Sequence, residues 1–241
     1  MSEAEAISFR SDMTVELVKA SARDSDVIWA ARVSTRGESS LEDVDADPEK
    51  ARGLINYLMR DRHGTPFEHT SLTYFVSAPI FVFREFMRHR IASYNEESGR
   101  YRELRPVFYV PGPDRNLVQQ GKPGAYEFVP GTPDQHRVVV EQTEASCRQA
   151  YAGYQEMLAA GVAREVARIV LPVTTYSSMY VTMNARALMN FLSLRTKHPD
   201  SHFPSFPQRE IEMVADLMEA EWAAVMPITH EAFAANGRVA P

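Results

Sequence analysis

The sequence lacks the features that mark disulfide-linked, membrane-spanning and secreted proteins. Its 241 residues include one cysteine, Cys147, so no disulfide can form within the chain, which fits a reducing compartment. There is no run of about 18 apolar residues of the kind that spans a membrane. Residues 1–12 are acidic and polar, without the apolar core of a signal peptide. We therefore expect a cytoplasmic protein.

Basic character, metal motifs and a dinucleotide fingerprint are also missing. The formal net charge is -6, with 26 Lys and Arg against 32 Asp and Glu, whereas nucleic-acid-binding domains are usually basic. The histidines do not show the one-turn pairing beside an acid that marks zinc hydrolases, so no metal site is expected. No Gly-x-Gly-x-x-Gly turn is present, so a bound dinucleotide would not be held by a Rossmann fingerprint.

Hydrophobic periodicity predicts helices and short strands without regular alternation. This favours the α+β class, with mixed helices and short antiparallel strands forming one compact domain over residues 1–241. Expected strands cover residues 13–19, 70–78, 106–110 and 176–183. Expected helices cover 24–33, 47–62, 80–89, 134–160, 164–171, 185–194 and 208–225. Three of them are expected to be capped by Asp47, Asp134 and Asn184. Irregular segments cover 38–47, 63–69, 93–102, 111–133 and 196–208.

Positive charge is concentrated in one stretch of this acidic chain, residues 84–102, which holds five arginines and a histidine. Arg84 and Arg88 are one helical turn apart and can share a helix face. A polar loop from Ser93 onward would add hydroxyls and backbone donors, a combination suited to phosphate. A solvated, salt-bridged helix face is the alternative, because Glu85 and residues 96–97 are close by.

The order of residues within this stretch is more specific than its charge. Residues 88–100 contain R-H-R-x-x-S-x-N-x-x-S-x-R and match the signature of the flavin-dependent thymidylate synthases at every fixed position. Three further segments resemble the same family in the same order: residues 63–69 (H-x-T-P-F-E-H), 164–172 and 184–195. The chain thus resembles the thymidylate synthase-complementing protein family over roughly residues 31–195.

The resemblance implies a reaction and its participants. It implies a homotetramer with FAD and dUMP bound where subunits meet. The expected activity is reductive methylation of dUMP to dTMP, in which methylenetetrahydrofolate donates one carbon and NADPH reduces the bound FAD.

Site residues follow from the resemblance, position by position. Flavin contacts are expected at Thr65, Glu68, Arg88, His89, Arg90, Glu96, Asn184, Arg186 and Asn190. The dUMP site is expected at Glu85, Phe86, Met87, Arg88, Glu96, Glu97, Ser98, Gly99, Arg100, Arg168 and Arg195. Two catalytic roles are implied: His63 stands beside the flavin ring and folate, and Arg195 interacts with the uracil ring and favours its ionised form.

Elementary chemistry agrees with a mechanism that does not use a cysteine. Cys147 falls mid-helix among small apolar residues, where a thiol is usually buried and inert. A guanidinium at Arg195 stays charged at any working pH and can stabilise negative charge on the ring. Arg186 and Asn190 share a face of an otherwise apolar helix, which we interpret as buried polar groups that a cofactor would satisfy.

The sequence departs from the family pattern after Arg195. A short polar loop with one histidine is expected there, but residues 196–208 are longer and rich in proline, and both His198 and His202 are candidates. The folate site is therefore not assigned. Three rival interpretations remain: a flavin- or nucleotide-binding protein without methyl transfer, a nucleic-acid-binding module using residues 84–105, and a purely structural protein.

Overall fold

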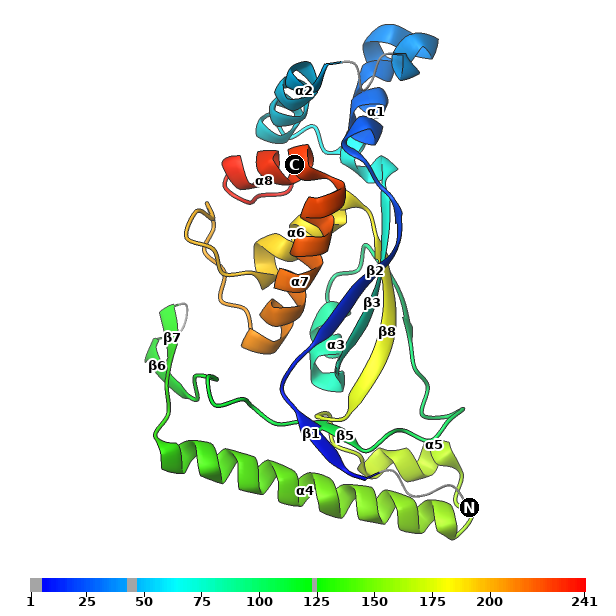
Figure 1. Ribbon diagram of the computed structural model, residues 1–241, viewed down its shortest axis with the longest axis vertical. Coiled ribbons are helices and arrows are strands. Elements are labelled where there is room, and N and C mark those ends of the chain that lie inside the picture. The colour runs from blue at the N-terminus through cyan, green and yellow to red at the C-terminus, as the bar shows by residue number, and fades with distance from the viewer. Residues whose placement is uncertain (1–5, 43–46, 123–124) are drawn as a thin grey trace. The chain divides into compact units, whose positions relative to one another are not determined.

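The computed structural model describes residues 6–42, 47–122 and 125–241 (Figure 1). These residues form two compact units. Of the described residues, unit 1 holds those in 6–13, Ser77–Glu85 and Glu96–Ser178. Unit 2 holds the described residues of Thr14–Val76, Phe86–Asn95 and Met179–Pro241. That the whole chain acts as a single domain stays a prediction.

Unit 2 is mainly helical. Its elements are β2 (Thr14–Ser21), α1 (Asp24–Arg36), the 3-10 helix η1 (Gly37–Leu41), α2 (Pro48–Arg60), the 3-10 helix η2 (Thr65–His69), α6 (Ala185–Arg195), α7 (Arg209–Val225) and α8 (Pro227–Ala235). Large side chains with less than 2% exposure fill its interior, among them Ile55, Phe67, Phe191 and Trp222.

Unit 1 carries the longest helix. Its elements are β1 (Ser8–Arg10), α3 (Ile80–Phe86, whose last residue belongs to unit 2), β5 (Val107–Tyr109), β6 (Val118–Lys122), β7 (Ala125–Val129), α4 (Pro133–Ala159), α5 (Arg164–Ala167) and the 3-10 helix η3 (Arg168–Val170). Strands β6 and β7 pair antiparallel. Strands β1 and β5 pair parallel, so the expectation of antiparallel strands does not hold for this pair.

One four-stranded sheet has residues in both units. Its order is β2-β3-β8-β4, where β3 is Ser71–Pro79, β8 is Tyr176–Met183 and β4 is Ser93–Glu96. Strand β3 alternates between buried and half-buried residues, with Leu72, Tyr74 and Val76 fully buried, as its period-two pattern predicts. Helices mixed with small sheets confirm the α+β class.

Several local predictions are confirmed by specific contacts. Asp47 caps α2 by accepting a hydrogen bond from the Lys50 amide at 3.1 Å, and Pro48 occupies the first turn. Asn184 caps α6 in the same way, accepting from the Ala187 amide at 2.8 Å. No described helix is long and apolar enough to cross a membrane.

Other local predictions are wrong, because caps and turns compete with periodicity. Thr132, not Asp134, caps α4, since its hydroxyl accepts from the Gln135 amide at 3.2 Å. Residues 111–133, expected to be irregular, contain the β6–β7 hairpin. Part of each loop expected at residues 38–47 and 63–69 is 3-10 helix, and positions 43–46 lie outside the described residues.

The helix expected over residues 80–89 ends at Phe86. The Tyr94 hydroxyl lies 2.8 Å from the Phe86 carbonyl oxygen and 2.6 Å from that of His89, so it supplies a donor where the helix stops. Arg88 therefore lies in a turn and does not share a helix face with Arg84. Residues 93–96, expected to be loop, form strand β4.

Candidate active site

In unit 2, the turn that follows α3 presents positive charge to solvent. Arg88 and Arg90 are exposed, and within the described residues neither forms a hydrogen bond or an ion pair. Between them, His89 is half-buried and packs edge-on against Phe191 of α6, with ring centroids 4.9 Å apart. Phe86 stacks on the same ring at 4.8 Å. The His89 ring between the two arginines is thus packed on aromatic side chains, while the Arg88 and Arg90 side chains are exposed to solvent and available to an anion.

His89 is tied to Arg195, the last residue of α6. Arg195 Nε donates a hydrogen bond to His89 Nε2 at 3.0 Å. Burial, with the charge of Arg195 in addition, lowers the pKa of His89 to about 4. The ring is therefore neutral near pH 7, and it holds the Arg195 guanidinium in one orientation. The structure brings together a predicted flavin contact and a predicted catalytic residue.

A second polar group lies at the start of α6. Arg186 Nη1 lies 2.5 Å from Glu68 Oε1, and Arg186 Nε donates to the main-chain oxygen of Pro241 at 2.6 Å. Arg186 and Asn190 are exposed, so the interpretation of this face as buried polar groups is wrong. Their helix is apolar because its opposite face fills the core, which leaves this face open to a ligand.

The loop that carries His63 is close to Arg186. A Cβ added at Gly64 would lie 2.4 Å from Arg186 Nε and 2.7 Å from the Pro241 oxygen, so only glycine fits there. His63 is exposed and stacks against Tyr57 of α2, with centroids 5.5 Å apart. Thr65, at the start of η2, is also exposed. His63, Thr65, Glu68 and Arg186 thus belong to one region of unit 2.

In unit 1, the predicted nucleotide-binding residues follow β4. Glu96 accepts a hydrogen bond from the Ser177 side chain and interacts electrostatically with Arg168. Its pKa is raised, chiefly by burial and also by the neighbouring Glu97, while the bond from Ser177 and Arg168 oppose this. A partly desolvated carboxylate beside a hydroxyl and a guanidinium suits recognition of polar ligand groups.

The same segment continues through ion pairs. Arg100 Nε lies 2.9 Å from Glu165 Oε2, and Arg102 Nε lies 3.1 Å from Glu97 Oε1. The alternative of a salt-bridged surface therefore fits Arg100 and Arg102 better than Arg88 and Arg90. The Ser98 hydroxyl accepts a hydrogen bond from the Arg100 amide at 3.3 Å, and Gly99 is buried against Leu104.

The predicted site residues divide between the two units. Unit 2 holds His63, Thr65, Glu68, Phe86, Met87, Arg88, His89, Arg90, Asn184, Arg186, Asn190 and Arg195, and unit 1 holds Glu85, Glu96, Glu97, Ser98, Gly99, Arg100 and Arg168. Phe86 is fully buried, and its carbonyl oxygen accepts a hydrogen bond from the Tyr94 hydroxyl, so the described residues leave no part of it exposed for the predicted substrate contact. Asn184 uses its side-chain oxygen to cap α6 and keeps only its amide nitrogen for a ligand.

Some residues that shape the site had no recognisable signal in the sequence. Tyr94, whose pKa burial raises to about 12, stays protonated and donates to the carbonyls at the end of α3. Phe191 supports both Phe86 and His89. Tyr57 supports His63, and Ser177 faces Glu96. Each reaches its partner through the tertiary structure.

Cysteine and metal chemistry find no support among the described residues. Cys147 is buried and its Sγ lies 3.3 Å from Thr174 Oγ1, and burial raises the pKa of the thiol. The prediction that Cys147 is buried is therefore confirmed, and a buried thiol with a raised pKa is a poor nucleophile. No cluster of three His, Cys, Asp or Glu side chains that could hold a metal ion occurs in the part of the chain that the structure describes.

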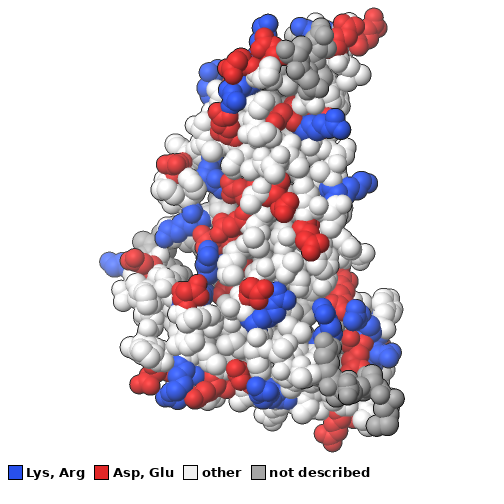
Figure 2. Space-filling model, viewed as in Figure 1, with Lys and Arg blue, Asp and Glu red and all other residues white. Residues whose placement is uncertain are grey.

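These groups fit an anionic dinucleotide better than a macromolecular polyanion. Arg88 and Arg90 offer two guanidinium groups that no described carboxylate neutralises, and Asn190 offers an exposed amide. On the face that Figure 2 shows, Lys and Arg side chains are interspersed with Asp and Glu. That face does not have the continuous basic surface of a nucleic-acid-binding domain.

Comparison with known proteins shows the family to which the chain belongs. The family model described as thymidylate synthase complementing protein matches residues 16–228. The flavin-dependent thymidylate synthase of Streptomyces coelicolor is 71% identical, covering 98% of this chain and 96% of that protein. The corresponding protein of Tropheryma whipplei strain TW08/27 is 58% identical, covering 97% of each chain.

Solved structures extend the likeness to three dimensions. Two crystal structures of the UMP/dUMP methylase PolB from Streptomyces cacaoi are 57% identical in sequence and cover 98% of this chain and 100% of that one. The TM-score is 0.89 for the complex with 5-Br UMP and 0.93 for the complex with 5-Br dUMP. The chain is therefore an enzyme and belongs to the thymidylate synthase-complementing protein family.

Proposed function

We propose that this enzyme converts dUMP to dTMP by reductive methylation, with FAD as its cofactor, methylenetetrahydrofolate as one-carbon donor and NADPH as reductant. The observation that carries the proposal is the hydrogen bond between Arg195, the last residue of α6, and His89. His89 lies between Arg88 and Arg90, two exposed arginines without an ion pair among the described residues. Relatives named flavin-dependent thymidylate synthase and the likeness to a UMP/dUMP methylase support it.

The unit 2 residues fit a flavin dinucleotide. Arg88 and Arg90 would neutralise its phosphates, and the Glu68–Arg186 pair with Asn190 would supply polar contacts along α6. Thr65, Asn184 and Glu96 complete the proposed flavin contacts. Bound FAD would supply hydride transfer, chemistry that no side chain performs.

The unit 1 residues fit recognition of a nucleotide. Arg100 and Arg168 are cations, Ser98 offers a hydroxyl, and Glu96 and Glu97 offer carboxylates for sugar or base donors. The proposed dUMP site also includes Gly99 and residues 85–88, of which Met87 and Arg88 are exposed. These roles are complementary, because a phosphate needs cations while ribose hydroxyls and ring N–H groups need acceptors.

Arg195 is the residue we assign to activation of the pyrimidine. Its guanidinium is permanently charged, and His89 holds its Nε, so its remaining N–H groups point in a fixed direction. Stabilising negative charge on the uracil ring raises the nucleophilicity of the ring carbon without a cysteine adduct. Cys147 is buried and cannot form such an adduct. His63, exposed on Tyr57, is proposed to stand beside the flavin ring and folate.

Assembly is the second part of the proposal. Large apolar side chains flank the site segments and are highly exposed in the single chain: Ile91 73%, Tyr101 79% and Ile169 75%. Such exposure next to polar site residues is typical of surfaces that another subunit covers. We propose a cytoplasmic homotetramer with sites between subunits. Sedimentation analysis with and without FAD tests it, and a monomer with full activity would contradict it.

The first experiment is an anaerobic absorption spectrum of the purified protein with dUMP, before and after NADPH. A flavin band that bleaches with NADPH and returns when methylenetetrahydrofolate is added, with dTMP formed, supports the function. UMP is offered in parallel, because the similar methylase binds analogues of both UMP and dUMP. Flavin reduction without a methylated product would favour the rival flavin-binding protein. Protein that stays colourless with added FAD would overturn the proposal.

A further inference from the structure

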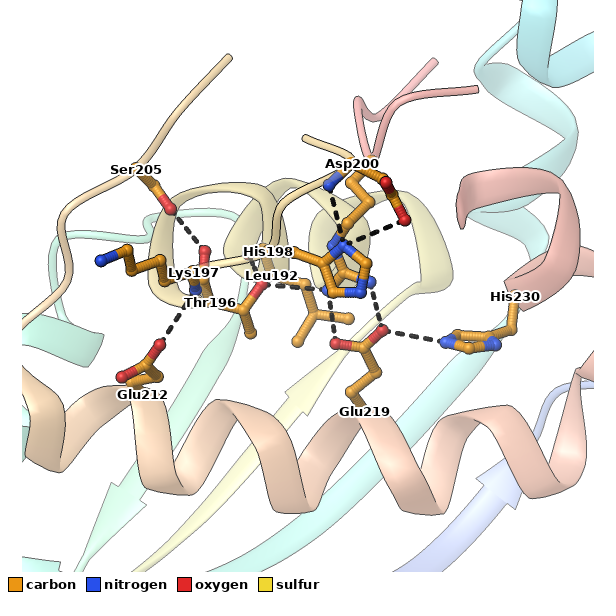
Figure 3. A network of polar contacts seen from close by, with 10 residues as sticks. Leu192, Thr196, Lys197, His198, Asp200, Ser205, Glu212, Glu219 and His230 are labelled. Carbon is orange, nitrogen blue, oxygen red and sulfur yellow. Dashed lines mark hydrogen bonds and ion pairs between the residues drawn. The ribbon is translucent and has the colours of Figure 1, made fainter. Parts of the chain in front are cut away.

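The last five residues of the sequence, 237–241, which we name the strap, lie against three segments of unit 2 that carry proposed site residues. Arg238 anchors the strap to α7: its Nη1 lies 2.7 Å from Glu219 Oε1 and its Nη2 lies 2.5 Å from Glu219 Oε2. His230 of α8 contacts the same carboxylate at 2.9 Å (Figure 3). Arg238 is only 4% exposed, so this ion pair is shielded from water.

The backbone is strained on both sides of a contact between the strap and Arg62, the residue before His63. Among the described non-glycine residues, positive φ occurs at Arg62 (63°) and Arg238 (55°). The Arg62 guanidinium donates to the carbonyl oxygens of Val239 and Ala240, at 3.2 and 2.9 Å. Left-handed backbone is unfavourable for these residues and persists only where surrounding contacts fix it. The hydrogen bonds between Arg62 and the strap therefore stabilise the conformations of both segments.

The strap also holds the end of α6. Arg238 Nη2 donates to Thr196 Oγ1 at 3.0 Å, and Thr196 Oγ1 donates to the Leu192 carbonyl oxygen at 2.7 Å. The Ser205 hydroxyl donates to the Thr196 carbonyl oxygen (Figure 3). Thr196 is 3% exposed and directly follows Arg195. The residue after Arg195 is thus fixed through its side chain and its carbonyl.

The third contact is at the start of α6. Arg186 Nε donates to the Pro241 oxygen at 2.6 Å, next to the Gly64 position where a Cβ would not fit. The strap therefore touches the His63 loop, Arg186 and the residue after Arg195. The contacts of Arg238 with Glu219 and Thr196 cannot themselves touch a substrate, since Arg238 and Thr196 are buried and Glu219 is nearly so.

We propose that the strap positions Arg195 and His63 for catalysis, with Arg238, Glu219 and Thr196 as its positioning residues. The proposal rests on the proposed function for the roles of Arg195 and His63. The ion pair fixes Arg238, Arg238 fixes Thr196, and Thr196 fixes the helix end whose last side chain is Arg195. Displacing a catalytic group such as the Arg195 guanidinium by about 1 Å lowers the rate by up to about 100-fold.

Thr196→Val is the decisive variant, because it keeps the shape of the side chain and the Arg238–Glu219 ion pair but removes the hydroxyl. We expect kcat per bound flavin to fall about 10- to 100-fold with little change in the KM for dUMP, the signature of a lost transition-state interaction. Thr196→Ser keeps the hydroxyl and should restore kcat. Thr182→Val, which removes a hydroxyl contact to Thr73 away from the strap, is the matched control.

The other end of the strap is tested by Arg62→Met against Arg60→Met. Arg60 is an exposed arginine of α2 paired with Asp61, and it has no contact with the strap. We expect Arg62→Met to lower kcat and Arg60→Met to leave it unchanged. Equal kcat in both, or an unchanged kcat in Thr196→Val, would overturn the proposal.

A second readout does not depend on turnover. The imidazole of His89, observed by NMR, reports its hydrogen bond from Arg195, and we expect its pKa to rise in Thr196→Val as Arg195 moves away. If the wild-type enzyme makes no dTMP, the proposed function fails, and the positioning role fails only if the His89 signal is also unchanged. A shifted His89 signal without any turnover would show the strap acting on Arg195 in an enzyme of different chemistry.

Discussion

The side chains of Arg195 and His89 meet 106 positions apart in the sequence, with 3.0 Å between Arg195 Nε and His89 Nε2. The pairing joins the end of α6 to the turn after α3, and Phe191 packs against the His89 ring from the α6 side. A neutral imidazole accepts the bond, whereas a protonated one would repel the guanidinium. The protonation state of one ring therefore controls the orientation of the residue that we assign to uracil activation.

His89 should titrate with a pKa of about 4 in an NMR experiment. Because this lies below the ordinary value of 6.5, the stability that neutral His89 contributes is present above pH 6.5 and is lost as the pH falls through 4. In Arg195→Met the pKa should rise but stay below 6.5, since burial is the larger cause of the shift. A pKa near 6.5 in the wild type would contradict the contact.

Glu219 should stabilise the fold against mild acid. Burial raises its pKa, but hydrogen bonds from His230 and Arg238 more than offset this and lower it to about 2. Its contribution is present above pH 4.5 and is lost as the pH falls through 2. We expect Glu219→Gln to lower the free energy of unfolding at pH 7 by roughly 3 kcal/mol.

Urea unfolding at pH 7 and pH 3 measures this difference. The gap between wild type and Glu219→Gln should narrow at the lower pH, because part of the carboxylate's contribution is then lost. Glu144→Gln, at an exposed ion pair of α4 with Arg148, serves as the control and should change the unfolding free energy by at most about 1 kcal/mol. A difference in unfolding free energy between wild type and Glu219→Gln that stays constant with pH would show that it does not come from the ionisation of Glu219.

Arg186→Met should weaken FAD binding. The change removes a guanidinium held by Glu68 and the Pro241 oxygen, and a hydrogen bond to a charged group is worth about 1.5–3 kcal/mol, or roughly 10- to 100-fold in Kd. Flavin fluorescence titration measures the Kd. Arg148→Met, at the exposed ion pair on α4, is the matched control and should bind FAD as the wild type does.

Arg168→Met should weaken dUMP binding without loss of FAD. Arg168 is a proposed dUMP contact, and its positive charge lowers the pKa of Glu96. Its removal therefore takes away a nucleotide contact and raises the pKa of Glu96 further. We expect the Kd for dUMP, measured by calorimetry on flavin-loaded enzyme, to rise about tenfold or more. An unchanged Kd for dUMP with an altered flavin spectrum would assign Arg168 to the flavin site and not to the dUMP site.

Cys147→Ala should leave dTMP formation unchanged. The side chain is 1% exposed and contacts Thr174, so the loss is a small cavity and a weak hydrogen bond, about 1 kcal/mol of stability. Thermal unfolding and turnover are measured on the same preparation. Loss of turnover with intact folding would require a role for the thiol that its burial argues against.

The sequence by itself determined the elements whose information is local. The Asp47–Pro48 start of α2, the Asn184 start of α6 and the alternation along β3 were all predictable, because caps and periodicity act within a few residues. The family was also predictable, because its signature motifs are short and contiguous, and the candidate site residues taken from these motifs stay predictions. The α+β class followed from the irregular order of helices and strands.

Only the tertiary structure decided which of these residues meet. The early end of α3 depends on Tyr94, and the exposure of Arg186 and Asn190 depends on which face of α6 fills the core. Glu68 and Arg186 lie 118 positions apart, and Arg238 reaches Glu219 and Thr196 from a segment with no motif. Such contacts are fixed by packing between distant segments, and a motif read along the chain carries no information about which side chains packing brings within hydrogen-bond distance.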